Sequence, residues 1–504
     1  MVTNPRLQAS EAYRMPVDIM PEVRATQNEP ISTSRKLSAR LEKHVRNDSI
    51  VVSHGSEADA LTIALNCTIR VPDNRDTNNL PPGLGTFPLF NVKDYAHKLP
   101  ESMARKGGIF FPMYQKEAMW INFSASAPFA IKIYVGGVNA VSGFPMTAND
   151  QTKAKRKRML QNGESIQDYM VLPEQRWLDG IVSEDGKIRQ FVAQPKGSGY
   201  SVEAQVTGEE NVGGIQIEIV PAKKNLPASF DVRYENKSRE VVTRTFNLAE
   251  KAITGESTWH DVKKSISVEF GIPVEDQVLR DYSLVGRSYP SQSRMTSLRI
   301  DFNDETKLCD VYFPPKFSTL SVTHHRSLPR CGKRKTVLGS ERGPAVLAMC
   351  AMPLSAAAAP EANEMGLAAG GLISQIIETD VHPADTWDVE ASVMVNLQIL
   401  DVESFCTVTG LPPPETPVDA AMYAQYDYPF FEIWGEEKTG IKGDFSGVKS
   451  VAQIDAEEAA AQGREFAEEA SVPVRVHQIG RPMPFSSTFL PVEVLRAELE
   501  DLQI

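Results

Sequence analysis

The stretch Phe129–Val141, FAIKIYVGGVNAV, decides the fold class, because apolar and polar side chains alternate along it before a glycine pair interrupts it. Such alternation is typical of a strand with one buried face, and paired glycines favour a turn. Comparable short runs, separated by Gly, Pro, Asn and Asp, recur from residue 58 to 225. We therefore predict a β sandwich or barrel over this range, interrupted by one short helix at residues 100–105.

The segment before this domain lacks such periodicity. Residues 1–57 are polar and contain proline, and only Ser34–Arg46 favours a short basic helix. A segment with so few apolar residues cannot bury enough surface to offset its loss of chain entropy. We therefore predict a mostly disordered tail.

Two dense basic clusters stand out along the chain. Lys153–Arg158 (KAKRKR) lies between predicted strands, and we interpret it as a solvated loop. Residues 330–335 lie in a basic, Ala-rich stretch over 318–362, which we interpret as a linker. For both clusters a nuclear-import signal is an alternative, and for the first a phosphate-contacting loop is another.

The clearest pattern of elements lies in residues 226–317. Two strand-like runs, SFDVRYE and VVTRTFNL, precede a helix predicted over Ser257–Phe270, which ends at a glycine. Val262, Ile266 and Val268 are expected to form the apolar face of this helix. Further strand-like runs follow, QVLRDYSLV, SLRIDF and LCDVYF. The resulting ββαββ order predicts a β-grasp domain.

Within this segment, Thr258–Leu284 resembles the helix-to-third-strand stretch of ubiquitin-like domains. The resemblance rests on an acid early in the helix, paired lysines, a Gly-Ile-Pro turn, an acidic-Gln pair and an apolar strand residue: Asp261, Lys263, Lys264, Gly271, Ile272, Pro273, Asp276, Gln277 and Leu279. It implies an embedded β-grasp domain over about 228–314 that docks a protein partner through Lys263, Lys264 and Ile272. No Arg-Gly-Gly tail ends the domain, so the resemblance implies no conjugation to other proteins.

Residues 363–504 are mixed in character and predict an α+β C-terminal domain. The alternating run TWDVEASVMVNLQIL indicates a strand, and Asp455–Glu469 indicates an acidic, Ala-rich helix. Gly366, Gly370 and Gly371 lack the lysine of a phosphate loop, so they predict a turn or close backbone packing. The chain as a whole is therefore expected to be a multidomain, β-rich α+β protein.

The composition of the 504-residue chain narrows the class of function. Its net charge of −12 argues against a nucleic-acid surface. The five cysteines are widely spaced without a CxxC, which indicates reduced thiols and a cytoplasmic protein, with the nucleus as the alternative. No apolar run of about 20 residues predicts a membrane span. The chain also resembles a set of uncharacterised microbial proteins, in runs such as GGIFFPMYQKEAMWINF, which supply no activity.

The sequence holds few groups for catalysis. Neither GxSxG nor a nucleotide-binding loop is present, and no cofactor is predicted. Asp380, His382, Asp385 and Asp388 alternate in a way that can hold a divalent cation, but Pro383 indicates a turn, where Asp is common for backbone reasons. An unrecognised enzyme with its site at this turn is therefore the last of our hypotheses.

Large aromatic residues of the N-terminal domain offer a binding surface. Phe111, Tyr114 and Trp120 flank one predicted hairpin, and Trp177 lies close to Asp179. Such rings either line a concave site for a small ligand or carbohydrate, or fill the core.

Taken together, these patterns favour a non-enzymatic protein-interaction or scaffold protein with a ubiquitin-like docking module. A small-ligand or carbohydrate-binding protein is the first alternative. The sequence leaves the oligomeric state open.

Overall fold

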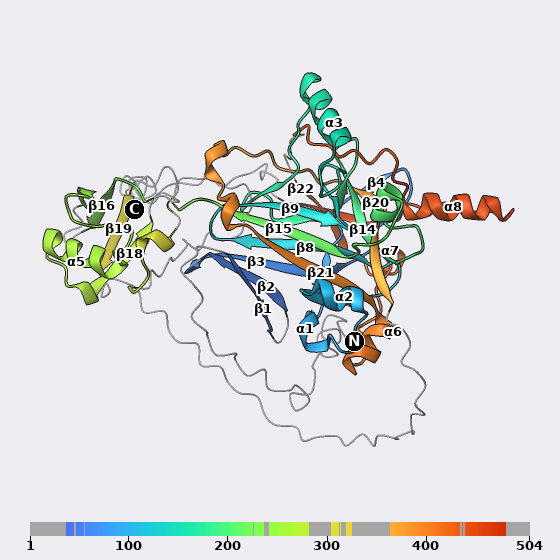
Figure 1. The fold of residues 1–504 in the computed structure, drawn as a ribbon, viewed down its shortest axis with the longest axis horizontal. Helices are drawn as coiled ribbons and strands as arrows, with labels where there is room; N and C mark the ends of the chain where they lie inside the picture. Colours follow the sequence, from blue (N-terminus) through green and yellow to red (C-terminus); the bar gives the residue numbers. More distant parts are fainter. Residues whose placement is uncertain are drawn as a thin grey trace, which may run out of the picture.

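The computed structural model describes residues 37–479, with gaps at 45–46, 55, 225, 236–240, 282–303, 312, 314–318, 325–362, 434–435 and 437–438. Its described part is β-rich, with one large, mainly antiparallel sheet and a few helices (Figure 1). Most of the predicted tail and the basic cluster at 330–335 lie outside the described residues.

The large sheet forms the main body of the molecule. Its strands are β1 (Ser38–Glu42), β2 (Ser49–His54), β3 (Ser56–Thr68), β4 (Thr77–Asn78), β5 (Gly83–Thr86), β6 (Phe90–Asn91), β7 (Ile109–Met113), β8 (Ala118–Ala125), β9 (Phe129–Val135), β10 (Val138–Asn139), β11 (Met170–Leu172), β12 (Trp177–Leu178), β13 (Gly180–Val182), β14 (Ile188–Pro195), β15 (Ile215–Pro221), β20 (Glu364–Ile373) and β21 (Val393–Asp401).

Two runs of paired strands make up this sheet. In one run β2, β3, β8, β14 and β20 are successive neighbours, and in the other β9, β15, β21 and β7 are. β20 and β21 pair with each other and so join the two runs. Buried side chains of both runs, such as Ile63 of β3 and Ile133 of β9, belong to one hydrophobic core. In β9 the alternation places Lys132, between Ile131 and Ile133, on the outer face, as its sequence predicts.

The start of the described chain differs from the predicted tail. β1 and β2 pair with each other, and β2 pairs with β3, so residues 38–54 belong to the sheet. Ser38–Glu42 is a strand where a short basic helix was expected. Ile50 and Val52 are fully buried. Val51, between them, is also apolar and only 6% exposed, so the three consecutive apolar residues give no alternating signal in a polar segment, which explains the error.

The C-terminal segment does not form a sheet of its own from β20 and β21. β20 pairs with β14, and β21 pairs with β15 and β7, so both strands complete the sheet of the first domain. Nearly every residue of β20 is buried, which requires neighbours on all sides. A Cβ at Gly371 would lie 2.3 Å from the backbone oxygen of Pro72, so this glycine allows close packing within a strand rather than a turn.

Short helices surround the sheet: α1 (Val92–Tyr95), α2 (Glu101–Lys106), α3 (Asp150–Gln161), α4 (Val202–Thr207), α6 (Val402–Thr409), α7 (Ala420–Gln425) and α8 (Val451–Ala461). α3 contains the basic cluster Lys153–Arg158, which we had expected in a loop. Two further strands, β22 (Pro429–Ile433) and β23 (Arg475–Ile479), form a small parallel sheet. No helix among the described residues is long and apolar enough to cross a membrane.

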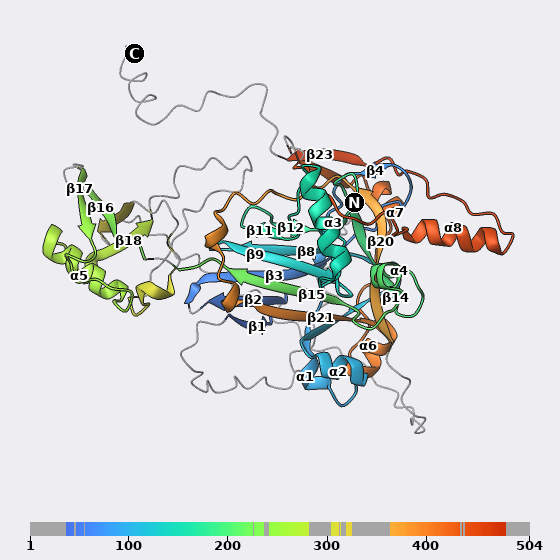
Figure 2. The ribbon, with the colours of Figure 1, turned by 45° about the horizontal axis from the view of Figure 1, so that its top comes forward.

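A second unit lies to one side of the main sheet in both Figure 1 and Figure 2. It consists of β16 (Ser229–Glu235), β17 (Val241–Asn247), α5 (Trp259–Phe270), β18 (Gln277–Asp281) and β19 (Thr319–His324). Its strand order is β17-β16-β19-β18, and β19 runs parallel to β16 at the centre. It has its own hydrophobic core. β19 falls in the range that we had interpreted as a linker.

One buried lysine connects the two units. Lys224 follows β15, and its ammonium group lies 3.0 Å from the Asp59 carboxylate in the main body. The same group donates a hydrogen bond to the backbone oxygen of Asp310 in the second unit, at 2.5 Å. Both charged side chains are more than 90% buried, so this contact is a fixed part of the structure.

Candidate functional site

The second unit presents one side of α5 to solvent. The helix begins after Thr258, whose backbone N–H donates to the Asp261 carboxylate at 3.0 Å, and it ends at Gly271 in the left-handed conformation. Val262 and Ile266 are fully buried against the sheet of the unit. The sequence predicts both ends of this helix from local signals, namely an acid near its start and a glycine after its end.

The outer face of α5 comprises His260, Lys264 and Val268, which are spaced four residues apart. Val268 is 87% exposed, so it does not share the apolar face of Val262 and Ile266 as we had expected. The reason is geometric, because two residues along a helix turn a side chain by about 200°. Val268 therefore lies on the solvent side of α5 with Lys264.

The three residues predicted to contact a partner lie in different environments. The Lys264 side chain is 60% exposed and its ammonium group lies 3.2 Å from the Asp261 carboxylate. Lys263 is only 13% exposed and its ammonium group lies 2.6 Å from the Asp304 carboxylate. Ile272 is 3% exposed and belongs to the core of the unit. Only Lys264 of the three is therefore freely accessible.

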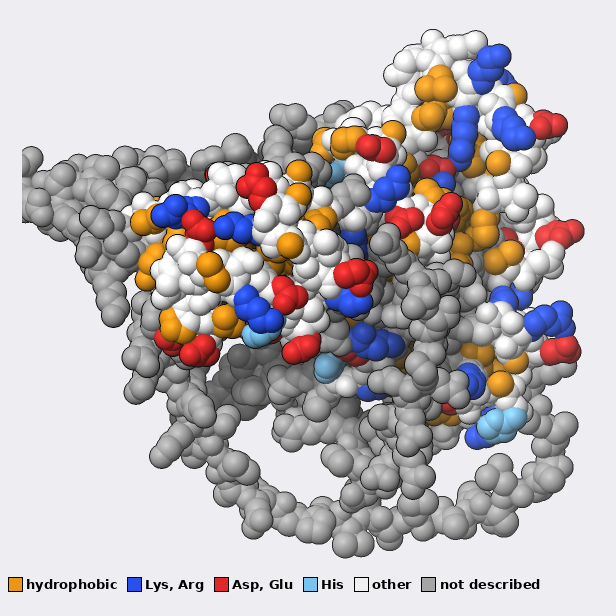
Figure 3. Space-filling view, turned by 60° about the vertical axis from the view of Figure 1, so that its left-hand side comes forward, with side chains coloured by type: hydrophobic (Ala, Val, Ile, Leu, Met, Phe, Trp, Pro, Cys, Tyr) orange, Lys and Arg blue, Asp and Glu red, His pale blue; other side chains and the backbone are white. Residues whose placement is uncertain are grey.

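Charged and apolar side chains are interspersed on the surface of the second unit, as Figure 3 shows for the side that it brings forward. A surface of this kind suits a contact in which a few apolar side chains are surrounded by charged ones.

The residues predicted to bind a ligand do not form one site. Phe111 is fully buried in the main core, and Asp179 is 3% exposed. Trp120 and Trp177 are partly exposed and share the outer face of neighbouring strands, because Trp177 lies opposite Asn122 in the register of β12 and β8. The ring of Trp120 packs against Gly83 at the start of β5.

Tyr114, the remaining predicted residue, lines a groove. Two adjoining hollows of about 590 and 550 Å³ share Gln115 and Asp401 as lining residues, and we call them together the groove. The Tyr114 hydroxyl donates to the Pro414 backbone oxygen at 2.8 Å, and its backbone N–H donates to the Glu117 carboxylate at 2.8 Å. Burial raises the pKa of Glu117 to about 7.

One end of the groove is charged. The Glu364 carboxylate lies 3.3 Å from the Lys106 ammonium group and 3.0 Å from that of Lys196. Burial alone would raise the pKa of Glu364, but hydrogen bonds from Ser102 and Lys196 and the two lysine charges lower it. The other end is lined by Met113, Val402 and further apolar side chains. The groove therefore offers an apolar wall and a fixed group of charges.

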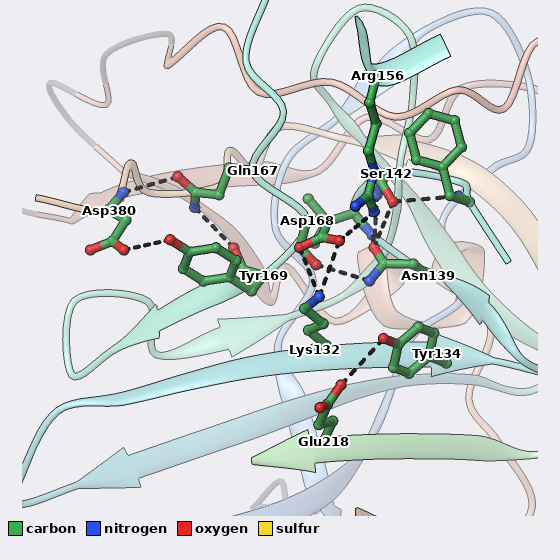
Figure 4. A network of polar contacts seen from close by, with 12 residues as sticks. Lys132, Tyr134, Asn139, Ser142, Arg156, Gln167, Asp168, Tyr169, Glu218 and Asp380 are labelled. Atoms are coloured by element: carbon green, nitrogen blue, oxygen red, sulfur yellow. Dashed lines mark hydrogen bonds and ion pairs between the residues drawn. The ribbon is translucent and has the colours of Figure 1, made fainter. Parts of the chain in front are cut away.

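The Asp380 turn is organised by hydrogen bonds. Figure 4 shows Asp380 beside Tyr169, whose hydroxyl donates to the carboxylate at 2.6 Å. The backbone N–H of His382 and the indole N–H of Trp387 donate to the same carboxylate, at 2.8 and 3.3 Å. In the described part of the chain, no group of three His, Cys, Asp or Glu side chains is placed to hold a metal ion.

The same network fixes α3 to the sheet. Asp168 is 7% exposed, and its carboxylate lies 2.6 Å from the Arg156 guanidinium of α3 and 3.2 Å from the Lys132 ammonium group of β9 (Figure 4). Part of the basic cluster is therefore used inside the molecule.

The described thiols are poor nucleophiles. Burial raises the pKa of Cys67 and of Cys406, so the reactive thiolate form is disfavoured at both positions.

Comparison with known proteins finds no match, either to a family model or, at a significant level, to a curated protein. The sites above therefore rest on geometry alone. Sequence reasoning missed the groove because Gln115, Lys196, Glu364 and Asp401 come from four distant segments, and none lies in a motif. It also placed Val268 on the buried face of α5, although the helical spacing from Ile266 was sufficient to predict that Val268 faces solvent.

Proposed function

We propose that this is a protein-interaction protein in which the second unit is a ubiquitin-like docking module carried on the main β body. The observation that carries the proposal is the strand order β17-β16-β19-β18, with a parallel central pair and α5 packed on one face. This is the arrangement expected of a β-grasp domain, which is usually a docking module.

The connection of the module to the body supports the same function. The chain leaves the large sheet after β15 and returns to it at β20, so the unit is an insertion with its own core. The large sheet completes its pairing without it. Changes on the surface of such a unit are therefore expected to leave the large sheet intact.

We assign the contact to the outer face of α5, where Lys264 and Val268 are both exposed. The test is quantitative affinity capture from an extract of the source organism, using the full-length wild-type protein and a Lys264→Glu/Val268→Asp variant. Truncating exposed contact residues commonly costs at least about tenfold in affinity at a hot spot. We expect at least one captured protein to fall by that factor.

The matched control is Lys93→Glu/Val389→Asp, which makes the same chemical changes at exposed positions of the main body. It should leave the captured proteins unchanged. Equal capture by wild type and by the α5 variant, with both folded, would contradict the assignment.

A second candidate function is binding of a small amphiphilic ligand in the groove, which the adjoining hollows and the accessible Tyr114 favour. In a thermal-shift screen, a ligand of this class should raise the melting temperature of wild type but not of Gln115→Ala. The control Trp177→Ala, outside the groove, should keep the shift. A screen without a shift that depends on Gln115 would remove this candidate.

A further inference from the structure

The helix α3 projects from the main body in Figure 1. A capping box begins it, in which the Thr152 N–H donates to the Asn149 side chain at 2.9 Å and the Asn149 N–H donates to the Thr152 hydroxyl at 2.8 Å. Arg156 pairs with Asp168, and Lys155 pairs with Asp444, so these two cations hold the helix in place.

The other cations of α3 point to solvent. Lys153, Lys157 and Arg158 are exposed, and we call them the basic face. Lys153 has an acid nearby, Asp150, at 3.7 Å. For Lys157 and Arg158 no ion pair is formed with any described residue. Leu160, three residues after Lys157, is 59% exposed, so the basic face ends in an apolar side chain.

A complementary surface lies elsewhere on the same chain. The helix α8 also projects from the body, and a capping box of Ser450 and Gln453 begins it. Exposed carboxylates follow along α8 and the segment after it, and we call them the acidic arm: Glu457, Glu458, Glu465 and Glu468. The arm also carries one exposed arginine, Arg464, and Phe466, which is 39% exposed.

We propose that the acidic arm of one copy of this chain binds the basic face of a second copy. The two surfaces are complementary. The basic face carries exposed cations and the exposed Leu160, and the acidic arm carries exposed carboxylates and the exposed Phe466. A polyanion is the less suitable partner, because three exposed cations, one of them beside Asp150, are too few for counterion-driven binding by a chain of net charge −12. Each copy carries both surfaces, so a two-fold dimer makes the contact twice.

The proposed contact consists mainly of exposed ion pairs. Exposed ion pairs are individually weak and are screened by salt, so association should be reversible and sensitive to ionic strength. The net negative charges of the two copies also repel each other, over distances longer than those within the ion pairs. Physiological salt screens this repulsion more effectively than it screens the ion pairs, so the repulsion does not prevent association.

The test is sedimentation of the full-length protein over a range of concentrations. We expect a dimer that weakens at least about tenfold in about 1 M NaCl, where the Debye length is about 3 Å. Lys157→Glu/Arg158→Glu and Glu465→Lys/Glu468→Lys should each weaken it by a similar factor. All four positions are exposed, so folding should be unchanged, and circular dichroism checks this.

The decisive measurement mixes the two reversed variants. Each is impaired alone, but an equimolar mixture should restore association, because the reversed charges are again opposite. The control Lys93→Glu/Arg105→Glu, with exposed cations on α1 and α2, should dimerise like wild type.

Three outcomes would overturn the proposal. One is a protein that stays monomeric at all concentrations up to about 0.5 mM, because the dissociation constant of the dimer would then be too high for a specific contact of this kind. Another is a dimer that neither reversed variant weakens, or that the mixture fails to restore. The third is binding of heparin or phosphatidylserine vesicles that depends on Lys157 and Arg158 in a protein that does not self-associate.

Discussion

Asp179 and Glu203 are both buried carboxyl groups, but their surroundings differ. Glu203 is 4% exposed, and it accepts hydrogen bonds from three successive backbone N–H groups of residues 211–213, at 2.8, 2.6 and 2.7 Å. Asp179 is 3% exposed, and its Oδ2 atom has no hydrogen-bond partner among the described residues. The first group anchors a loop, whereas the second is a source of instability.

Burial raises the pKa of Asp179 to about 7, well above the value of about 3.9 for an unfolded chain. The folded state therefore binds the proton more tightly, and stability falls as the pH rises from about 4 to about 7. Asp179→Asn cannot ionise, so it should stabilise the protein at pH 8 by roughly 2–4 kcal/mol and have little effect at pH 4.

Urea unfolding across this pH range measures the effect. The control is Asp185→Asn, because hydrogen bonds from Ser183 and Lys187 lower the pKa of that half-exposed carboxyl despite some burial. It should not stabilise the protein at pH 8. A gain for Asp179→Asn that did not change with pH would contradict the assignment of the effect to ionisation.

At the scale of elements, prediction succeeded where the determinants are local. The helix α5 has an acid near its start, apolar residues spaced by four and a glycine after its end, and its boundaries follow from these signals. β9 shows the alternation of a strand, and its odd-numbered residues lie in the core. Neither element needs information from distant residues.

Prediction failed where the determinants are distant or hidden. The start of α3 is marked in the sequence only by Asn149. Its Lys and Arg residues are good helix formers, but a dense basic cluster is also typical of a solvated loop. Asp168 and Asp444, which hold the helix in place, are remote in sequence. β20 is almost entirely buried, and the strand with which it pairs over most of its length, β14, lies far away along the chain. The groove is unpredictable for the same reason, because Gln115 and Asp401 meet only in the folded sheet.

At the scale of the whole molecule, the chain has two large and separate cores. One contains the side chains of the large sheet, and the other contains α5 and its four strands. Among the described residues few contacts cross between them, and Lys224 makes one that does. Units that share so little surface are expected to unfold independently.

Ile266→Ala, in the second core, should therefore destabilise only the second unit, by about 2–5 kcal/mol. Hydrogen exchange read by mass spectrometry should show faster exchange in α5 and β16 and unchanged exchange in β9. Ile133→Ala in β9 should produce the reverse pattern. Faster exchange throughout both units in either variant would show that they unfold together.

The late position of β20 and β21 in the chain has a consequence for synthesis on the ribosome. β14 and β15 emerge first, and the partners that cover their remaining edges follow only after residues 222–363 have been translated. At about 5–20 residues per second this delay lasts roughly 10–30 s. During that time the nascent chain exposes two long strand edges, so its yield should depend on chaperones more than its finished fold would suggest.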